Sequence, residues 1–141
     1  MADENGSRHQ ALIDLGNRQR DLGFFNDALQ SYREAETIKG DMQLSLKIAS
    51  TMQTQGRVPM AVHEMDKALR AYTEVTVDKE LLSVAQLFHA CALSYMTVRF
   101  QPALDLGLKF YEEFVRGVPI EDFNGYQVRV VNIVTCNQCS A

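Results

Sequence analysis

Hydrophobic residues recur every three or four positions along most of this chain, which is the spacing of one face of an α-helix. The clearest stretch lies between Leu12 and Ile38, where two such faces follow one another after a short break. Its small and apolar positions suit two short antiparallel helices packed closely together: Leu12, Leu15, Gly16, Gly23, Phe25, Ala28, Tyr32 and Ala35. The pattern continues and predicts helices over about residues 8–22, 25–38, 42–55, 58–74, 79–97 and 100–116.

Residues typical of helix ends support this division. Asn26 precedes an apolar periodic stretch and is a candidate N-cap. Pro59 and Pro102 fall just inside the start of two predicted helices, where a missing backbone N–H costs nothing. Gly40 and Gly117 follow periodic stretches, as C-terminal caps do.

The helix pair occurs a second time. Gly23 and Ala28 are five residues apart, and so are Gly56 and Ala61. In each case the glycine falls at a turn between helices, and the alanine falls where two helices press closest together. Ala28 and Ala61 are separated by thirty-three residues, close to the period of about thirty-four residues of one class of helical repeat.

A third copy is less regular. Phe100 and Ala103 stand where the first copy has Phe25 and Ala28. Val98 occupies the place of the turn glycine, and the step from the second copy is forty-two residues. The longer step predicts longer helices around residues 72–82.

The first unit resembles a tetratricopeptide repeat (TPR), in which a large residue precedes Leu-Gly and an alanine and an aromatic residue follow. Here Leu15 and Gly16 match the dipeptide, and Ala28 and Tyr32 match the later positions. The resemblance covers about residues 9–116 and divides the chain into three helix pairs, 9–41, 42–76 and 79–117. It implies an all-α fold, a right-handed superhelical solenoid of antiparallel helix pairs.

The two ends of the chain fall outside these pairs. Residues 1–8 are polar, and we expect a disordered N-terminus. Residues 118–141 form either a capping helix over 121–138 or an incomplete fourth repeat with a mobile C-terminus, in which case the chain is a fragment of a longer array. The β-branched run around Val128 and Val130 would also suit a strand, but an array needs its last apolar face covered, which favours the helix.

Composition narrows the class of protein. Hydrophobic residues make up 46% of the chain and charged residues 23%, as in folded domains. The net charge of −4 gives no basic stripe for nucleic acid. No apolar run approaches the length of a membrane helix, and the N-terminus has no secretory signal. Three cysteines fit reduced thiols, so we expect a cytoplasmic protein, with the nucleus as an alternative.

The sequence offers no catalytic, cofactor or metal site. Cys136 and Cys139 form a lone CxxC pair, and His9, His63 and His89 have no ligand spacing to it. We expect this pair to be a mobile pair of thiols. No serine or cysteine belongs to a nucleophile motif and no glycine-rich phosphate loop occurs, so we do not expect an enzyme.

The resemblance implies a binding surface, because the first helix of each TPR pair lines a concave groove. Phe88, Tyr95 and Met96 have an equal alternative as core residues beneath a capping helix. The implied groove residues are Gln10, Ile13, Asn17, Arg20, Asp21, Gln43, Leu46, Lys47, Ser50, Gln53, Thr54, Ala85, Phe88, His89, Ala92, Tyr95 and Met96.

One TPR class binds the acidic EEVD tails of heat-shock chaperones through a clamp of lysine, asparagine and arginine side chains. At the corresponding places this chain has Ile13, Asn17, Lys47, Ala85 and His89. Only Asn17 matches, so the set of charge-assisted donors is missing. We therefore do not expect this chain to bind EEVD tails.

The resemblance thus predicts a non-enzymatic adaptor or scaffold that binds a partner peptide or helix in the concave groove. The alternative is a structural module that self-associates through its C-terminal end, or a fragment of a larger TPR-containing signalling protein. The identity of the partner does not follow from the sequence.

Overall fold

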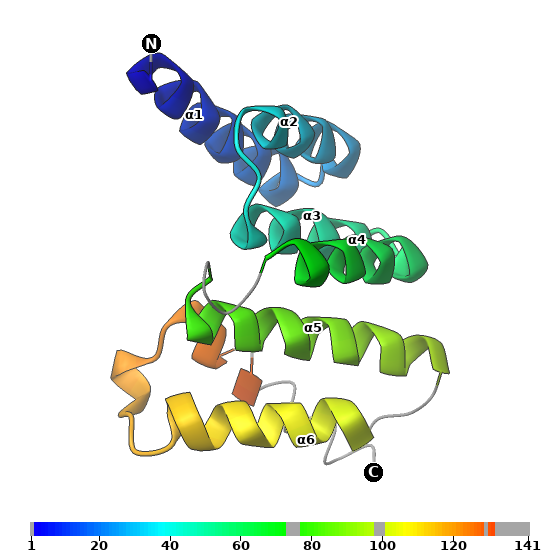
Figure 1. The fold of residues 1–141 in the computed structure, drawn as a ribbon, viewed down its shortest axis with the longest axis vertical. Helices are drawn as coiled ribbons and strands as arrows, with labels where there is room; N and C mark the ends of the chain where they lie inside the picture. Colours follow the sequence, from blue (N-terminus) through cyan, green and yellow to red (C-terminus); the bar gives the residue numbers. More distant parts are fainter. Residues whose placement is uncertain (1, 73–76, 98–100, 129, 132–141) are drawn as a thin grey trace. The chain divides into compact units, whose positions relative to one another are not determined.

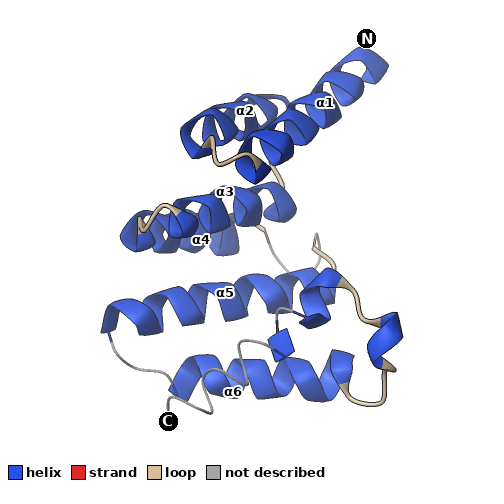
Figure 2. Ribbon diagram, turned by 180° about the vertical axis from the view of Figure 1, so that it is seen from behind, coloured by secondary structure: helices blue, strands red, loops and turns tan. Residues whose placement is uncertain are grey.

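The computed structural model describes residues 2–72, 77–97, 101–128, 130 and 131, and within them every regular element is helical (Figures 1 and 2). The helices of the first part are α1 (Ala2–Asp21), α2 (Phe25–Ile38), α3 (Met42–Thr54) and α4 (Val58–Ala71). Those of the second part are α5 (Lys79–Thr97), α6 (Gln101–Phe110), the π-helical turn η1 (Tyr111–Val115) and the 3-10 turn η2 (Ile120–Asp122). The chain divides into two compact units, residues 1–72 and 73–141.

The first unit consists of two antiparallel helix pairs. Helix α1 packs on α2 and α3 packs on α4, while α2 also contacts α3 and so joins the pairs (Figure 1). Tyr32, Ile48 and Met65 are fully buried, and the alanines of the repeat, Ala28 and Ala61, are fully buried as well. Except at the start of α1, the helix boundaries of this unit agree with the predicted ones to within about three residues.

A glycine follows the first helix of each pair: Gly23 after α1 and Gly56 after α3. Gly23 has φ of 86° and Gly56 has φ of 81°, a left-handed conformation that favours glycine. After each glycine, the backbone N–H of the next residue donates a hydrogen bond to a carbonyl of the preceding helix. The Phe24 N–H, for example, donates to the carbonyl of Gln19 at 2.8 Å. The repeated glycine therefore sets the tight turn of each hairpin.

Close helix packing requires a third glycine in the middle of α1. A Cβ atom added to Gly16 would lie 2.5 Å from Cε1 of Tyr32. Real Cβ atoms do not approach a ring that closely, so α1 and α2 can pack at this separation only because position 16 has no side chain. Gly6, on the same helix, has no atom within 4 Å of the equivalent position.

Two predicted caps differ from the structure. Helix α2 begins at Phe25 without a side-chain cap, and Asn26 instead accepts a hydrogen bond from Gln55 Nε2 at 2.8 Å. Gly40 does not have positive φ, so it is not a left-handed C-cap; a Cβ atom there would lie 2.9 Å from the hydroxyl at the tip of the Tyr72 side chain. The predictions for Pro59, near the start of α4, and Gly117, with φ of 83°, are confirmed.

An ion pair connects the second helices of the two pairs. Arg33 on α2 donates two hydrogen bonds to the carboxylate of Glu64 on α4, at 2.9 and 2.8 Å. Glu64 is only 3% exposed. Burial opposes its ionisation, but the hydrogen bonds and charge of Arg33, with help from Lys67 and His63, outweigh burial and lower the pKa of Glu64.

The second unit packs α5 against α6, and α6 continues into η1. The rings of Phe110 and Phe114 lie 4.8 Å apart across this junction. Gln127 donates a side-chain hydrogen bond to the carbonyl of Phe114 at 2.6 Å, and Val130 is fully buried. The chain after η2 thus returns onto η1.

The two chain ends differ in part from expectation. Residues 2–8, which the sequence assigned to a disordered N-terminus, belong to α1. Near the other end, residues 125–128, 130 and 131 are helical, within the predicted capping helix over 121–138, and residues 129 and 132–138 lie outside the described part. The helix begins with a reciprocal cap: the backbone N–H groups of Asn124 and Gln127 each donate to the other's side chain at 2.9 Å.

Replacing Gly16 with alanine should lower the free energy of unfolding by about 1–3 kcal/mol, because the new methyl group overpacks against Tyr32. The matched control is Gly6→Ala on the same helix, which should be neutral or stabilising because alanine is the better helix former. Urea unfolding followed by circular dichroism measures both. Equal effects of the two substitutions would contradict the close contact.

Replacing Glu64 with glutamine should lower the free energy of unfolding at neutral pH by about 1–2 kcal/mol, because charged hydrogen bonds to Arg33 are lost. The expected loss is kept small because the Arg33 side chain is partly exposed to solvent. The folded pKa of Glu64 is lowered, so the pair stabilises the protein above the unfolded pKa and is lost as pH falls through the folded pKa. The difference between wild type and variant should therefore shrink below about pH 4.5.

The control for this experiment is Glu112→Gln, because Glu112 and Arg116 form an exposed pair within a single segment. Its removal should change stability little at any pH. Thermal unfolding of the three proteins between pH 3 and 7 makes the comparison. A constant difference for Glu64→Gln across that range would show that the ion pair does not contribute as described.

Candidate functional site

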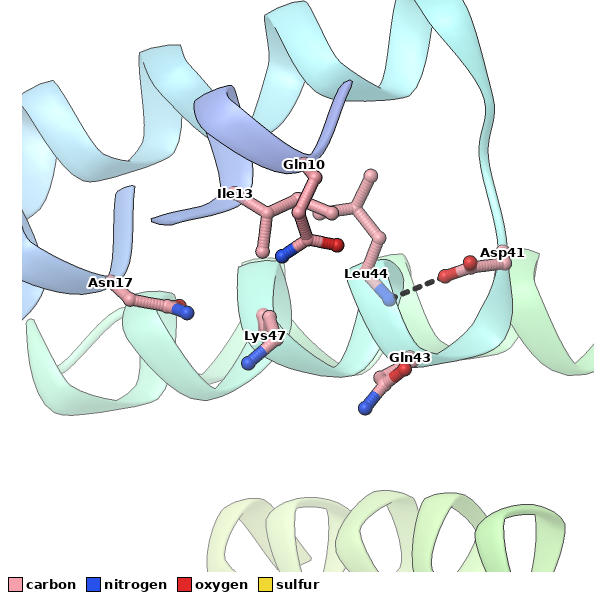
Figure 3. Close-up of a pocket in the computed structure, with 7 residues that line it drawn as sticks. All are labelled: Gln10, Ile13, Asn17, Asp41, Gln43, Leu44 and Lys47. Carbon is pink, nitrogen blue, oxygen red and sulfur yellow. Dashed lines mark hydrogen bonds between the residues drawn. The ribbon is translucent and has the colours of Figure 1, made fainter. Parts of the chain in front are cut away.

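A cavity of about 210 Å³ lies between α1 and α3 in the first unit (Figure 3). The side chains around it are mainly polar, with two aliphatic members. We call this space the α1–α3 cavity. Its lining residues are Gln10, Ile13, Asn17, Asp41, Gln43, Leu44 and Lys47.

Helix periodicity brings the predicted residues together. Gln10, Ile13 and Asn17 lie three and four residues apart and therefore share one face of α1. Gln43 and Lys47 are one turn apart on α3. The two faces meet across the cavity, so five of the sequence-predicted groove residues lie around one space.

The core holds Asn17 in one orientation. The Tyr32 hydroxyl donates a hydrogen bond to Oδ1 of Asn17 at 2.6 Å, which ties the Asn17 side chain to the core. Burial raises the pKa of the Tyr32 phenol, while the nearby charge of Arg20 opposes that shift. Tyr32 therefore remains a protonated donor at neutral pH.

Charges lie at two places in the cavity lining. Asp41 caps α3, and its Oδ1 accepts the Leu44 N–H at 2.8 Å. Lys47 is half-buried one turn further along α3. Gln10, on α1, donates to Asp14 at 2.9 Å, and its amide extends toward the cavity (Figure 3). The lining thus combines one carboxylate, one ammonium group and three amides.

Sequence reasoning missed Asp41 and Leu44. The sequence does contain a signal for both residues: Asp41 is a typical N-cap residue, and Leu44 follows it by three positions, where the capped N–H lies. That spacing identifies the start of a helix, but it does not reveal that the start faces a cavity.

Other predicted residues in the first unit lie elsewhere. Arg20 donates to the Ser50 hydroxyl at 2.8 Å, a contact that ties α1 to α3. Leu46 is buried, so its side chain offers no surface to a partner. Gln53 is half-buried and Thr54 donates to a carbonyl of its own helix at 2.9 Å. Asp21 is exposed at the end of α1.

The predicted residues of the second unit lie on α5. Phe88 and His89 are half-buried and Met96 is 47% exposed. Ala92, like Ala85, is fully buried and therefore contributes packing and not an accessible side chain. The side chain of Tyr95 lies outside the described part of the structure.

The described residues show neither a metal site nor a membrane-spanning helix. No group of three or more histidine, cysteine or acidic side chains there is arranged to hold a metal ion. In the same part of the chain no helix has both the length and the apolar character needed to cross a membrane. Cys136 and Cys139 lie outside the described residues.

The arrangement of helices matches a known structure. The chain superposes on the complex of the TPR2AB domain of yeast Sti1 with pHSP90 with a TM-score of 0.70 and 15% sequence identity. The match covers 96% of this chain and 49% of that one, so the chain spans about half the length of the matched protein. This chain has a TPR-like fold.

The TPR-like fold confirms the predicted all-α solenoid of helix pairs. No family model and no curated protein sequence matches the chain. At 15% identity the structural likeness establishes the fold, and it does not by itself assign a partner to this chain.

The contact between Tyr32 and Asn17 gives a testable prediction. Tyr32→Phe should lower the free energy of unfolding by about 0.5–1.5 kcal/mol, the usual net value of one hydrogen bond. It should also free the Asn17 amide to rotate, which NMR would detect as a changed side-chain amide resonance. Tyr111→Phe, at a half-exposed position, is the control. An unchanged Asn17 resonance would mean that Tyr32 does not orient it.

Proposed function

We propose that this chain is a non-enzymatic adaptor or scaffold module that binds an extended segment of a partner protein on the face formed by the first helices of its TPR-like pairs. The observation that carries the proposal is the α1–α3 cavity, where amide and charged side chains from two helices converge. The TPR-like fold supports it, because such folds commonly serve as interaction modules and not as enzymes.

The chemistry of the cavity suits a peptide main chain. Asparagine and glutamine amides each offer both a donor and an acceptor, which is what a peptide group requires. Gln10, Asn17 and Gln43 supply three such amides from two helices. Ile13, which is half-buried, adds aliphatic surface for a neighbouring side chain.

The matched solved structure is itself a complex of a TPR domain with pHSP90. That supports a protein partner for this chain. The residues of this chain nevertheless argue against the chaperone EEVD tail as the ligand. Ile13 places an aliphatic group in the cavity where the resembling clamp has a lysine. We therefore propose a partner segment of different sequence.

The second unit has candidate contacts of its own. We propose that Phe88, His89 and Met96 on α5 contribute to partner binding there, with Met96 offering an exposed apolar contact. Aromatic and flexible apolar residues of this kind often anchor a bound peptide. The alternative of self-association through the C-terminal end is less supported, because Val130, an apolar residue near that end, is fully buried.

Site-specific photo-crosslinking tests the proposed face. A photoreactive residue at Gln43, which is exposed and lines the cavity, should capture a partner from cells. The same residue at Arg70, exposed on α4, is the control and should not capture that protein. The crosslink at position 43 should weaken with Lys47→Met and persist with Lys67→Met, an equivalent change on α4.

Capture of the same protein from position 70 alone would place the binding surface on the second helices and would overturn the proposal. So would a crosslink at position 43 that joins two copies of this chain. Circular dichroism of each variant would first establish unchanged helix content. Mass spectrometry of the crosslinked species distinguishes these outcomes.

A further inference from the structure

We infer that a second cavity of the first unit binds the ammonium group of a lysine side chain from another protein. This cavity has a volume of about 420 Å³ and lies among α2, α3 and the end of α4. It shares no lining residue with the α1–α3 cavity, so the inference goes beyond the proposed function and does not depend on it. The lining residues that carry the inference are Glu36, Ser45, Lys67, Ala71 and Tyr72.

Three side chains with oxygen atoms line this cavity, and each comes from a different helix. Glu36 lies in the last turn of α2, Ser45 lies near the start of α3, and Tyr72 directly follows α4. Ser45 is only 5% exposed and yet lines the cavity. Within the described residues, no hydrogen bond engages the hydroxyl of Ser45 or that of Tyr72. Both oxygens can therefore accept a hydrogen bond from a ligand.

The electrostatic environment at Tyr72 favours a positive charge. Burial raises the pKa of the Tyr72 phenol, and the charges of Asp41, Glu36 and Glu64 raise it further. Three carboxylates thus act on the same hydroxyl group. Such a field attracts a cation and repels an anion, so we expect a cationic ligand.

The two cationic side chains nearest to these carboxylates already have partners. Arg33 donates to both oxygens of Glu64 and also to Oε1 of Glu36, at 3.0 Å. Lys67 lies 3.8 Å from Glu64 and is mostly exposed. Because Arg33 engages one oxygen of Glu36, that carboxylate offers its second oxygen to a ligand, and not both.

This set of acceptors suits an ammonium group better than a guanidinium group. An ammonium group has three N–H donors that point in separate directions, which matches three oxygens on three helices. A guanidinium group is planar and binds best to a carboxylate that offers both oxygens, and Glu36 cannot do so. The exposed Ala71 and the ring of Tyr72 supply apolar surface for the methylene groups of a lysine.

NMR titration of the isotope-labelled chain tests the inference. The probe is lysine with an acetylated α-amino group and a methylamide in place of the carboxyl group, so its only charge is the side-chain ammonium. Backbone amide resonances of Glu36, Ser45 and Ala71 should shift and reach saturation. The same probe with an acetylated side chain should leave them unchanged, because acetylation removes the charge.

Two further probes distinguish the source of the positive charge. One is the arginine derivative with the same blocked ends, and the other is alanine methylamide, which has a free α-amino group and no side-chain amine. Each should bind at least about fivefold more weakly than the lysine probe, the size expected for the loss of one well-placed hydrogen bond.

Three variants should change the affinity for the lysine probe in opposite directions. Glu36→Gln should weaken binding about fivefold and Tyr72→Phe about threefold, because each removes part of the acceptor set. Lys67→Met should tighten binding about threefold, because a competing positive charge is gone. Glu34→Gln, at an exposed position on α2, is the matched control and should leave the affinity unchanged.

Several results would overturn the inference. One is the absence of saturable shifts at the cavity, and another is equal binding of the side-chain-acetylated probe. Tighter binding of the alanine probe would assign the cavity to a chain N-terminus, and equal binding of the arginine probe would remove the preference for ammonium. Weaker binding in Lys67→Met would show that the ligand is not drawn by negative charge. Should Glu36→Gln not fold, Tyr72→Phe and Lys67→Met decide.

Discussion

The absence of a side chain at Gly16 is the constraint on which the first unit depends. It lets the ring of Tyr32 lie against the backbone of α1, and at that distance the ring's hydroxyl reaches Asn17. A core contact thereby fixes a polar side chain of the candidate site. The second pair meets the same geometric need differently: Ala49 takes the place of glycine and the flexible Met65 takes the place of the ring, both fully buried.

Much of the fold could be predicted because its determinants are local. Turn glycines, a helix-starting proline and apolar residues at helical intervals each act over a few positions, and they recur once per repeat. Asn26 and Gly40 show where this reasoning ends. Asn26 looks like an N-cap in sequence, but its side chain accepts a hydrogen bond from Gln55. Gly40 looks like a C-cap, but its φ is not positive and the position of its missing Cβ lies against the hydroxyl of Tyr72. Both partners lie about thirty positions away in sequence.

The candidate site could be predicted less completely than the fold. Residues such as Gln10, Asn17 and Lys47 were implied by the resemblance to TPR pairs, whose first helices line a groove. Helical periodicity explains why those on one helix share a face. Leu46 has a comparable position along α3 but is buried, because this helix packs on more than one neighbour. Asp41 was missed because the start of α3 faces the cavity only once α1 is packed beside it. The packing of one helix against another is a non-local property, and the periodicity of residues along a single helix does not encode it.

The link between Arg33 and Glu64 has a consequence for how this molecule unfolds. Arrays of repeats behave as rows of neighbours, each stabilised by its own contacts and by its interface with the next. If the first hairpin opened alone, Glu64 would lose its main counter-charge and both hydrogen bonds to Arg33, which makes that intermediate costly. The two hairpins are therefore coupled energetically, and residues 1–72 should lose their structure as one cooperative block and not as a zipper that frays from one end.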